Sequence, residues 1–365
     1  MKIMFIGSAK NIHTVRWVNA LSDKGHEVYL ITNKNHYDGI DGLNPNINVH
    51  KLTYGGTIGY YLNTIQIKRI YKKIQPDIVN AHYASGYGVL ARVAKLKPLI
   101  LSVWGSDVYD FPYESKIKMK IIRKNIKFAD QIASTSYSMA KQVENIMQKK
   151  MSIQITPFGV DTEVFIKNSE LKSKEYFIFG TVKTLSEKYG IEYIIKAFKI
   201  FLDKIENEIV KKQPILIIYG KGELEEKLKK LCVELKIEDK VFFKGYILNK
   251  EVPNAINNMD VFCLGSILDS ESFGVAAVEA MACEVPVIAT DVSGFKEVIL
   301  NEKTGYIVER KNENEIADKM YELFKDKKMR LDMGQRGRKR VLELYDWKEN
   351  VNTMLEIYKK TMMSN

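Results

Sequence analysis

The stretch ESFGVAAVEAMACEVPVIATD, residues 271–291, passes from a polar loop into an alanine-rich helix and then into an apolar strand. We expect the helix to begin near Ser272 or Phe273, because Ser272 can cap it and Gly274 leaves its first turn open. A helix that leads directly into a short apolar strand is typical of a parallel sheet, in which helices connect successive strands. The stretch therefore predicts an α/β fold.

The same alternation of short apolar strands and helical patterns continues in both directions along the chain. The strand-like segments are KIMFIG, HEVYLIT, DIVNAH, PLILSVWG and DQIAST in the first half, and YFIFGTV, PILIIYG, KVFFKGY, DVFCLGS and PVIAT in the second. Because 365 residues exceed the roughly 250 that one hydrophobic core organises, we expect two doubly wound, Rossmann-like parallel-sheet domains. Such sheets bind ligands at the carboxyl ends of their strands, so two facing domains would leave a ligand cleft between them.

The polar segment Lys167 to Lys174 is the best candidate for a linker. It predicts a first domain over residues 1–166 and a second over 167–346. The remaining segment, 347–365, is helical in pattern and has Val351, Met354 and Tyr358 on one face, so it can pack back on the first domain.

Composition narrows the class of protein. No run approaches the roughly 20 apolar residues of a membrane span, and MKIMFIGSAK lacks the features of a signal peptide, so we expect a cytoplasmic protein. Cys232, Cys263 and Cys283 show no CxxC spacing and stand in apolar or helical contexts. We expect them to be buried, without disulfides or zinc.

Positive charge is concentrated in the first half of the chain. Residues 1–165 carry 22 Lys and Arg against 12 Asp and Glu, whereas residues 166–365 carry 34 against 33. This asymmetry indicates that the first half faces an anionic partner, either nucleic acid or an anionic membrane.

Glu271 and Glu279 lie on either side of the expected helix start. The backbone N–H groups of a first helical turn bind anions, and carboxylates accept hydrogen bonds from vicinal hydroxyls, so a phosphate between a sugar and a ribose would fit. Lys183 and Lys188, after the strand YFIFGTV, can add positive charge for a diphosphate. From the residues alone, Glu271 and Glu279 can equally be ordinary helix glutamates, and Lys183 and Lys188 can be solvated lysines without a binding role.

Five segments, in chain order, resemble the retaining family 4 glycosyltransferases of the GT-B fold. They are GHEVYLIT, TPFGVDTEVF, GTVKTLSEKYG, YGKGELEEKLKKL and the E-x7-E segment ESFGVAAVEAMACEVPVIATD. The resemblance implies that Glu279 binds the ribose hydroxyls of a nucleotide sugar and that Glu271 contacts the donor sugar. It also implies that the lysines neutralise the diphosphate, with Lys183 standing where an arginine is common. The remaining donor contacts it implies come from the backbone: Phe273, Gly274 and Val275 for the distal phosphate, and the region from Gly245 to Ile247 for the base.

The first domain of such enzymes holds the acceptor. The loop GSAKNIH, from Gly7 to His13, would face the diphosphate, and it lacks the GxGxxG of a dinucleotide site. In SVWGSD, Trp104 stands where many relatives carry histidine, so Trp104 can instead stack on a sugar, with Asp107 as the nearest polar candidate. His13 and His82 complete the acceptor-side candidates.

The expected chemistry is transfer with retention of configuration. Lys183, Lys188 and the helix start after Glu271 would stabilise the charge on the departing diphosphate. No nucleophile and acid pair of the glycosidase type and no DxD motif stand out, so we expect front-face attack without a metal or other cofactor. Family frequency favours a uridine donor; the transferred sugar and the acceptor stay open.

A basic helical face lies in the segment KIKMKIIRKNIKF. Its spacing puts five cations on one side of a helix: Lys116, Lys120, Arg123, Lys124 and Lys127. A second basic group, KRIYKK, covers residues 68–73. Either can be a solvated face of a lysine-rich chain, but their place in the first domain predicts peripheral attachment to the inner face of the cell membrane and a lipid-linked or glycan acceptor.

Three other classes of protein compete with this interpretation. A nucleic-acid-binding protein would explain the charge but not the expected diphosphate site. A nucleotide-sugar epimerase or a glycan phosphorylase could use the same scaffold, although neither explains the basic first half together with this chain length. A noncatalytic sugar-binding protein would lack donor hydrolysis.

Overall fold

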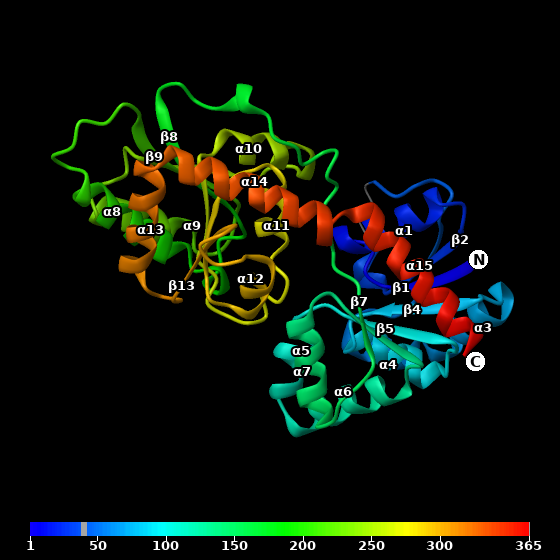
Figure 1. The fold of residues 1–365 in the computed structure, drawn as a ribbon. Helices are drawn as coiled ribbons and strands as arrows, with labels where there is room; N and C mark the ends of the chain where they lie inside the picture. Colours follow the sequence, from blue (N-terminus) through cyan, green and yellow to red (C-terminus); the bar gives the residue numbers. More distant parts are fainter. Residues whose placement is uncertain (38–41, 365) are drawn as a thin grey trace. The chain divides into compact units, whose positions relative to one another are not determined.

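The computed structural model describes residues 1–37 and 42–364, and the chain forms two compact units. The first comprises residues 1–158 and 348–365, and the second residues 159–347. Figure 1 labels their helices and strands.

A seven-stranded parallel sheet, in the order β3-β2-β1-β4-β5-β6-β7, forms the centre of the first unit. The order changes direction between β1 and β4, where a doubly wound sheet binds its ligands. The central strands β4 and β5 are buried along their whole length. The strands are β1 (Lys2–Ile6), β2 (Glu27–Thr32), β3 (Asn48–Lys51), β4 (Ile78–His82), β5 (Leu99–Val103), β6 (Gln131–Ser134) and β7 (Ile153–Ile155).

The helices of the first unit bury their apolar faces against this sheet. Asn11, Ser115 and Ser136 cap α1, α6 and α7 through side-chain hydrogen bonds. The helices are α1 (Ile12–Asp23), α2 (Gly56–Leu62), α3 (Thr64–Ile74), α4 (Gly86–Ala94), α5 (Ser106–Tyr109), α6 (Lys116–Phe128), α7 (Tyr137–Met147) and most of α15 (Trp347–Met363).

A six-stranded parallel sheet, in the order β10-β9-β8-β11-β12-β13, forms the second unit, and its direction changes between β8 and β11. The strands are β8 (Tyr176–Val182), β9 (Gln213–Tyr219), β10 (Val241–Gly245), β11 (Val261–Leu264), β12 (Val287–Thr290) and β13 (Gly305–Val308). The helices are α8 (Ile191–Lys204), α9 (Glu225–Glu234), α10 (Val252–Asn258), α11 (Val275–Ala282), α12 (Ser293–Val298), α13 (Glu313–Lys325) and α14 (Lys327–Leu344).

Both sheets confirm the predicted fold class of two doubly wound parallel-sheet units. The sequence prediction omitted β3, β7 and β13, which are edge strands of three or four residues. The strands β3 and β7 are only partly covered and lack the continuous apolar run by which the other strands are recognised, whereas β13 is mostly buried but only four residues long. All three cysteines are buried and free, as expected.

The helix α11 begins at Val275, so the prediction that it starts near Ser272 or Phe273 is wrong. Gly274 adopts a left-handed backbone conformation, with φ of 83°, and therefore cannot continue a right-handed helix. A Cβ atom at this position would also lie 2.7 Å from Cδ1 of Phe295. The glycine thus fixes both where the helix begins and how closely α12 approaches it.

The second unit begins at Gly159, eight residues before the predicted boundary at 166/167. Backbone contacts hold the intervening segment to the second unit: Val160 pairs with Asp346 in a β-bridge, and Arg338 donates 2.8 Å to the carbonyl of Thr162. At the other end of the chain, α15 buries Tyr358 in the first unit, where its hydroxyl donates to Oδ1 of Asn80 at 2.9 Å.

Candidate functional site

Lys183, Lys188 and Glu271 come together at the carboxyl ends of β8 and β11, where the order of the second sheet changes direction. Lys183 directly follows β8, and its Nζ lies 3.1 Å from Oε2 of Glu271. Lys188 belongs to the short 3-10 helix Glu187–Tyr189. Both lysines approach the Tyr189 ring, whose centroid is 4.8 Å from Nζ of Lys183 and 5.5 Å from Nζ of Lys188. This grouping agrees with the place where doubly wound sheets bind ligands.

The Lys183–Glu271 ion pair is largely withdrawn from water. The side chains are 14% and 10% exposed, so the pair interacts in a medium of low dielectric. Burial by itself lowers the pKa of Lys183, but the nearby carboxylates of Glu271 and Glu279 outweigh it, and the net effect raises the pKa. Lys183 therefore stays cationic at neutral pH, held in place by a carboxylate that can also accept hydrogen bonds from hydroxyl groups.

The loops that carry these residues are fixed to each other through the backbone. The amide of Ile267 donates to the carbonyl of Lys188 at 2.9 Å. This contact requires Gly190, which has φ of 55° and whose Cβ, if present, would lie 2.1 Å from the carbonyl oxygen of Gly265. One pair of loops thus sets the positions of Lys188 and Glu271 together.

The first turn of α11 completes this edge. Ala277 and Val278 donate to the carbonyl of Gly274, so the amides of Val275 and Ala276 precede the first hydrogen bonds of the helix. Of the eight residues of α11, only Val275 and Glu279 are not buried. They are four residues apart and therefore share one face. Phe273 is buried and packs edge-on against Tyr345, with ring centroids 5.5 Å apart.

Gly245 and Ile247 lie at the end of β10, on the same edge of the sheet. Ile247 lines a cavity of about 630 Å³ together with Tyr219 and Tyr246. The carbonyl of Tyr219 accepts from the amide of Lys183 at 3.0 Å, which connects the wall of this cavity to the lysine.

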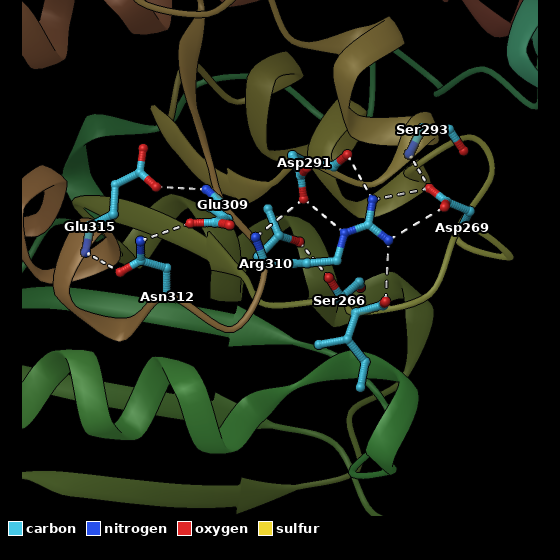
Figure 2. Close-up of polar contacts among 10 residues, drawn as sticks. Ser266, Asp269, Asp291, Ser293, Glu309, Arg310, Asn312 and Glu315 are labelled. Atoms are coloured by element: carbon cyan, nitrogen blue, oxygen red, sulfur yellow. Dashed lines mark hydrogen bonds and ion pairs between the residues drawn. The ribbon is translucent and has the colours of Figure 1, made fainter.

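Arg310, a residue that the sequence analysis did not select, fastens the loop of Glu271 (Figure 2). Its Nε donates 2.8 Å to Asp291, and its terminal nitrogens contact both carboxylate oxygens of Asp269 at 3.3 Å and the carbonyl of Ile267 at 3.3 Å. The amide of Ser293 donates 2.8 Å to the same Asp269 carboxylate. The loop between β11 and α11 is therefore tied to the ends of β12 and β13.

A signal for this arrangement exists in the sequence. Asp269, Asp291 and Arg310 each follow a strand, and those strands, β11, β12 and β13, are neighbours in the sheet. Burial raises the pKa values of both aspartates, but hydrogen bonds and the Arg310 charge outweigh it and leave both pKa values lowered. Finding the cluster from sequence would have required β13, which was not predicted.

The acceptor-side candidates lie in the first unit, and most of them are buried. His82 is 1% exposed; its Nε2 lies 3.0 Å from Oδ1 of Asn80, and its ring centroid lies 4.1 Å from that of Phe5. Burial holds the pKa of His82 well below its usual range, so the ring is neutral. This geometry favours a structural role over contact with an acceptor.

Trp104 belongs to an aromatic cluster in the same unit. It is 8% exposed, and its ring packs edge-on against His82, His13 and Phe158 at centroid distances of 4.0, 6.0 and 5.1 Å. His13 stacks on Phe158 at 4.0 Å and is half-buried. Within this cluster, His13 has more surface for a ligand than Trp104 does.

Asp107 and Gly7 also lie after strands of the first sheet. Asp107 is 1% exposed and accepts backbone hydrogen bonds from Ala84 at 2.7 Å, Trp104 at 3.1 Å and Gly105 at 2.9 Å. Burial raises the pKa of Asp107, and the backbone hydrogen bonds, which lower it, offset only part of this effect. Its oxygens thus hold the turn after β5, which favours a structural role. Gly7 follows β1, and its amide donates to Ile31.

The basic face of α6 is mostly as expected. Lys116, Lys120, Lys124 and Lys127 are exposed, but Arg123 is half-buried and donates 2.8 Å to the carbonyl of Ile146. Residues 1–37 and 42–364 contain no group of three His, Cys, Asp or Glu side chains that could hold a metal ion. Within the same described ranges, no helix has the length and apolar character needed to cross a membrane.

Comparisons with known proteins place the chain in a family. Residues 163–340 match the family described as Glycosyl transferases group 1, and residues 2–136 match Glycosyl transferase 4-like. The chain is 30% identical to a capsular polysaccharide biosynthesis glycosyltransferase, CapM, of Staphylococcus aureus, covering 74% of this chain and 73% of that protein. It is 28% identical to the N-acetyl-alpha-D-glucosaminyl L-malate synthase of Bacillus anthracis, covering 93% and 90%.

Among solved structures, the fold is similar to that of Anabaena Alr3699/HepE in complex with UDP. The TM-score is 0.81 and the sequence identity is 16%. The match covers 99% of this chain and 100% of that chain.

Proposed function

Because the chain belongs to the group 1 glycosyltransferases, of family 4 type with the GT-B fold, we propose that it transfers a sugar from a UDP-sugar to a lipid-linked or glycan acceptor, with retention of configuration. The observation that carries the proposal is the buried Lys183–Glu271 pair beside Lys188 and the start of α11. The HepE relative, which was solved with UDP, supports a uridine donor.

In this proposal each group of the second unit has one task. Lys183, Lys188 and the first-turn amides of α11 stabilise the diphosphate as it gains negative charge. Glu271 accepts hydrogen bonds from the sugar, and Glu279, about one turn into α11 on its half-buried face, accepts them from the ribose. The base lies near Gly245 and Ile247, beside the cavity that Tyr219 lines.

The transfer then needs no protein nucleophile. The bond between the anomeric carbon and the diphosphate oxygen breaks, and the acceptor oxygen bonds to the same face of that carbon. The acceptor proton passes to the departing phosphate oxygen. Two lysines and a helix start supply the positive charge that a metal would otherwise provide, so we propose that transfer is metal-independent.

The membrane part of the proposal rests on the first unit. The exposed lysines of α6 stand next to Ile117, which is 71% exposed, and α2 and α3 expose Ile58, Leu62 and Ile65 at 53% or more. The helix α4 contacts α2, α3 and α6. Exposed apolar side chains with cations on neighbouring helices suit an anionic bilayer, where a lipid-linked acceptor would be reached.

The L-malate synthase relative favours a second candidate acceptor, a small hydroxy acid, with N-acetylglucosamine as the sugar. A direct test incubates the full chain and EDTA with UDP-glucose, UDP-galactose or UDP-N-acetylglucosamine, each with L-malate or with a polyprenyl-diphosphate-linked sugar. Product formation with an α linkage by NMR supports the proposal and identifies the acceptor. Donor isomerisation without transfer would contradict the proposed transfer. A β-linked product would contradict retention of configuration. Activity that is lost in EDTA and restored by a divalent metal would contradict metal independence.

Membrane attachment is tested separately by flotation with vesicles. We expect the protein to float with vesicles containing phosphatidylglycerol and to stay in solution with phosphatidylcholine alone. A variant carrying Lys116→Gln, Lys120→Gln and Lys124→Gln should float less, whereas the matched triple change Lys227→Gln, Lys230→Gln and Lys236→Gln in the second unit should not matter. Protein that stays soluble with anionic vesicles at low salt would contradict attachment.

A further inference from the structure

A basic cavity lies at the amino-terminal edge of the second sheet, opposite the edge that carries Lys183 and Glu271. Its volume is about 850 Å³, and its lining includes Phe177 near the start of β8, Asp260 just before β11 and Pro286 just before β12. Because β8 rises about 3.3 Å per residue, the cavity lies roughly 20 Å from Lys183. It is therefore separate from the proposed donor site, and nothing argued below depends on that site.

The cavity carries an excess of positive charge. Seven of its lining side chains are cationic and three are carboxylates. Each carboxylate already has a partner: Glu208 contacts Lys325 at 2.8 Å, Glu284 contacts Lys167 at 2.7 Å, and Asp260 accepts from the amide of Ile178 at 2.8 Å. The other five cations have no ion pair within the described residues; they are Lys172, Lys211, Lys212, Lys327 and Arg330.

Three of these five cations are held in place by uncharged groups. Lys172 donates to the carbonyl of Met259, and Lys212 donates 2.5 Å to that of Ser173. Arg330 donates 3.1 Å to the carbonyl of Phe324, and its guanidinium lies 4.8 Å from the ring centroid of Phe177. Carbonyl oxygens orient a cation without neutralising it, and each ammonium keeps two further N–H donors. These three cations are thus held in place without an ion pair, and the more distant charges of Asp260 and, for Arg330, Asp326 offset the cost of their burial only in part.

Burial makes the uncompensated charge costly. Burial is the main reason why the pKa of Lys172 falls to about 8, and the charge of Asp260 recovers only part of the decrease. A bound anion would favour the charged form of Lys172, and the attraction between the two charges would stabilise the complex.

The remaining walls are apolar. Phe177, Phe324 and Leu331 line the cavity, and Ile209 lies fully exposed at its rim. A volume of this size is in the range of small-molecule sites, which combine apolar walls with a few charged groups. Lysine and arginine side chains together are the usual partners of phosphate. We propose that this cavity binds an organic phosphate ester with at least two negative charges and an apolar or aromatic part.

Calorimetric titration of the full chain with ADP tests the proposal, since ADP combines a diphosphate with an aromatic base. The variant carrying Lys172→Met and Lys212→Met should weaken ADP binding at least tenfold. The matched variant carrying Lys227→Met and Lys230→Met removes the same charge from the exposed surface of α9 and should change the Kd less than twofold. Equal weakening in both variants would overturn the proposal, because it would mean nonspecific attraction.

Two further arms fix the source and the place of the ligand. Vesicles containing phosphatidic acid, whose headgroup is a phosphate monoester, replace ADP in the same comparison, and a response confined to the vesicles assigns the cavity to a lipid headgroup. Hydrogen exchange should slow in residues 206–213 and 325–331 when the ligand binds. Absence of binding by both probes at millimolar concentration, or protection elsewhere only, would overturn the proposal.

Proton uptake gives an independent readout. At pH 8 the Lys172 amine is about half protonated, and a bound anion raises its pKa, so binding should take up a fraction of a proton. Titrations in buffers of different ionisation enthalpy measure this uptake. It should disappear in Lys172→Met, and uptake that persists in this variant would exclude Lys172 from the site.

Discussion

The ion pair between Lys183 and Glu271 gives Lys183 a role beyond that of a single positive charge. As an isolated lysine after a strand it supplies positive charge; paired with Glu271 at 3.1 Å, it also orients the carboxylate before any ligand arrives. A diphosphate that engages Lys183 would loosen this pair and leave Glu271 available to the sugar hydroxyls. Binding of the two parts of a nucleotide sugar would then be coupled through one ion pair.

Lys188→Ala should reduce turnover at saturating donor by about 100-fold or more, the size expected when one group that stabilises a developing anion is lost. Steady-state kinetics with whichever UDP-sugar gives product in the incubation test provide the measurement. Lys196→Ala, on the neighbouring helix α8, is the control and should retain activity. A Lys188→Ala rate close to that of the wild type would remove Lys188 from the catalytic role.

Arg310→Lys should lower kcat/KM for the donor roughly tenfold, because an ammonium cannot hold two aspartates and a carbonyl in one plane as guanidinium does. The loop that ends at Glu271 should also exchange its amide hydrogens faster. Arg336→Lys is the control, since Arg336 donates to the carbonyl of Lys303 at an exposed position. Unchanged exchange in residues 265–272 would show that Arg310 does not position the loop.

At the scale of elements, α11 explains why its segment is rich in alanine. The helix is buried on every side except the one that Val275 and Glu279 share, and small side chains let it pack closely between the sheet and α14. Such a helix has little freedom to shift, so its first turn and Glu279 stay at fixed positions along the edge of the sheet. The left-handed Gly274 sets that position.

Gly274→Ala should lower the free energy of unfolding by more than about 1 kcal/mol, because the new Cβ adds a clash with the Phe295 ring to the cost of a positive φ. Gly25→Ala separates the two effects: Gly25 has φ of 78° but no atom within 4 Å of the new Cβ. Chemical denaturation should therefore show the smaller loss for Gly25→Ala. Equal losses of unfolding free energy would mean that the Phe295 ring moves away from the new Cβ without cost.

Titration with UDP extends the same comparison to function. Gly274→Ala should weaken UDP binding, since the backbone of the proposed phosphate site shifts, while Gly25→Ala in the first unit should bind as the wild type does.

At the scale of the whole molecule, the first unit is completed by a segment that lies far away in the sequence, whereas the second is one continuous stretch. The last helix, α15, buries Val351, Met354 and Tyr358, and most of it belongs to the first unit. Beneath it, Oδ1 of Asn80 accepts from Tyr358 and lies 3.0 Å from Nε2 of His82. The C-terminal end of the chain thus reaches the strand β4 that carries two of these residues.

Tyr358→Phe should destabilise the first unit by about 1 kcal/mol, since it leaves a buried acceptor with one hydrogen bond fewer. Hydrogen exchange of β4 amides provides a readout specific to this unit. Tyr61→Phe, at a position 45% exposed, is the control. No change in β4 for Tyr358→Phe would show that the hydroxyl adds nothing to the packing of α15.

The sequence by itself determined the two doubly wound sheets and their central strands, and it singled out Glu271, Glu279, Lys183 and Lys188, because strand and helix periodicities and short spacings are local properties. Only the tertiary structure decided that Lys183 pairs with Glu271 and that Arg310 holds the loop between β11 and α11. It also decided that His82, Trp104 and Asp107 are buried within the first unit. These facts depend on which strand ends are neighbours and how closely helices cover them. Contacts between residues as distant as Lys183 and Glu271, or Asn80 and Tyr358, arise from the order of strands in a sheet, which no local pattern contains.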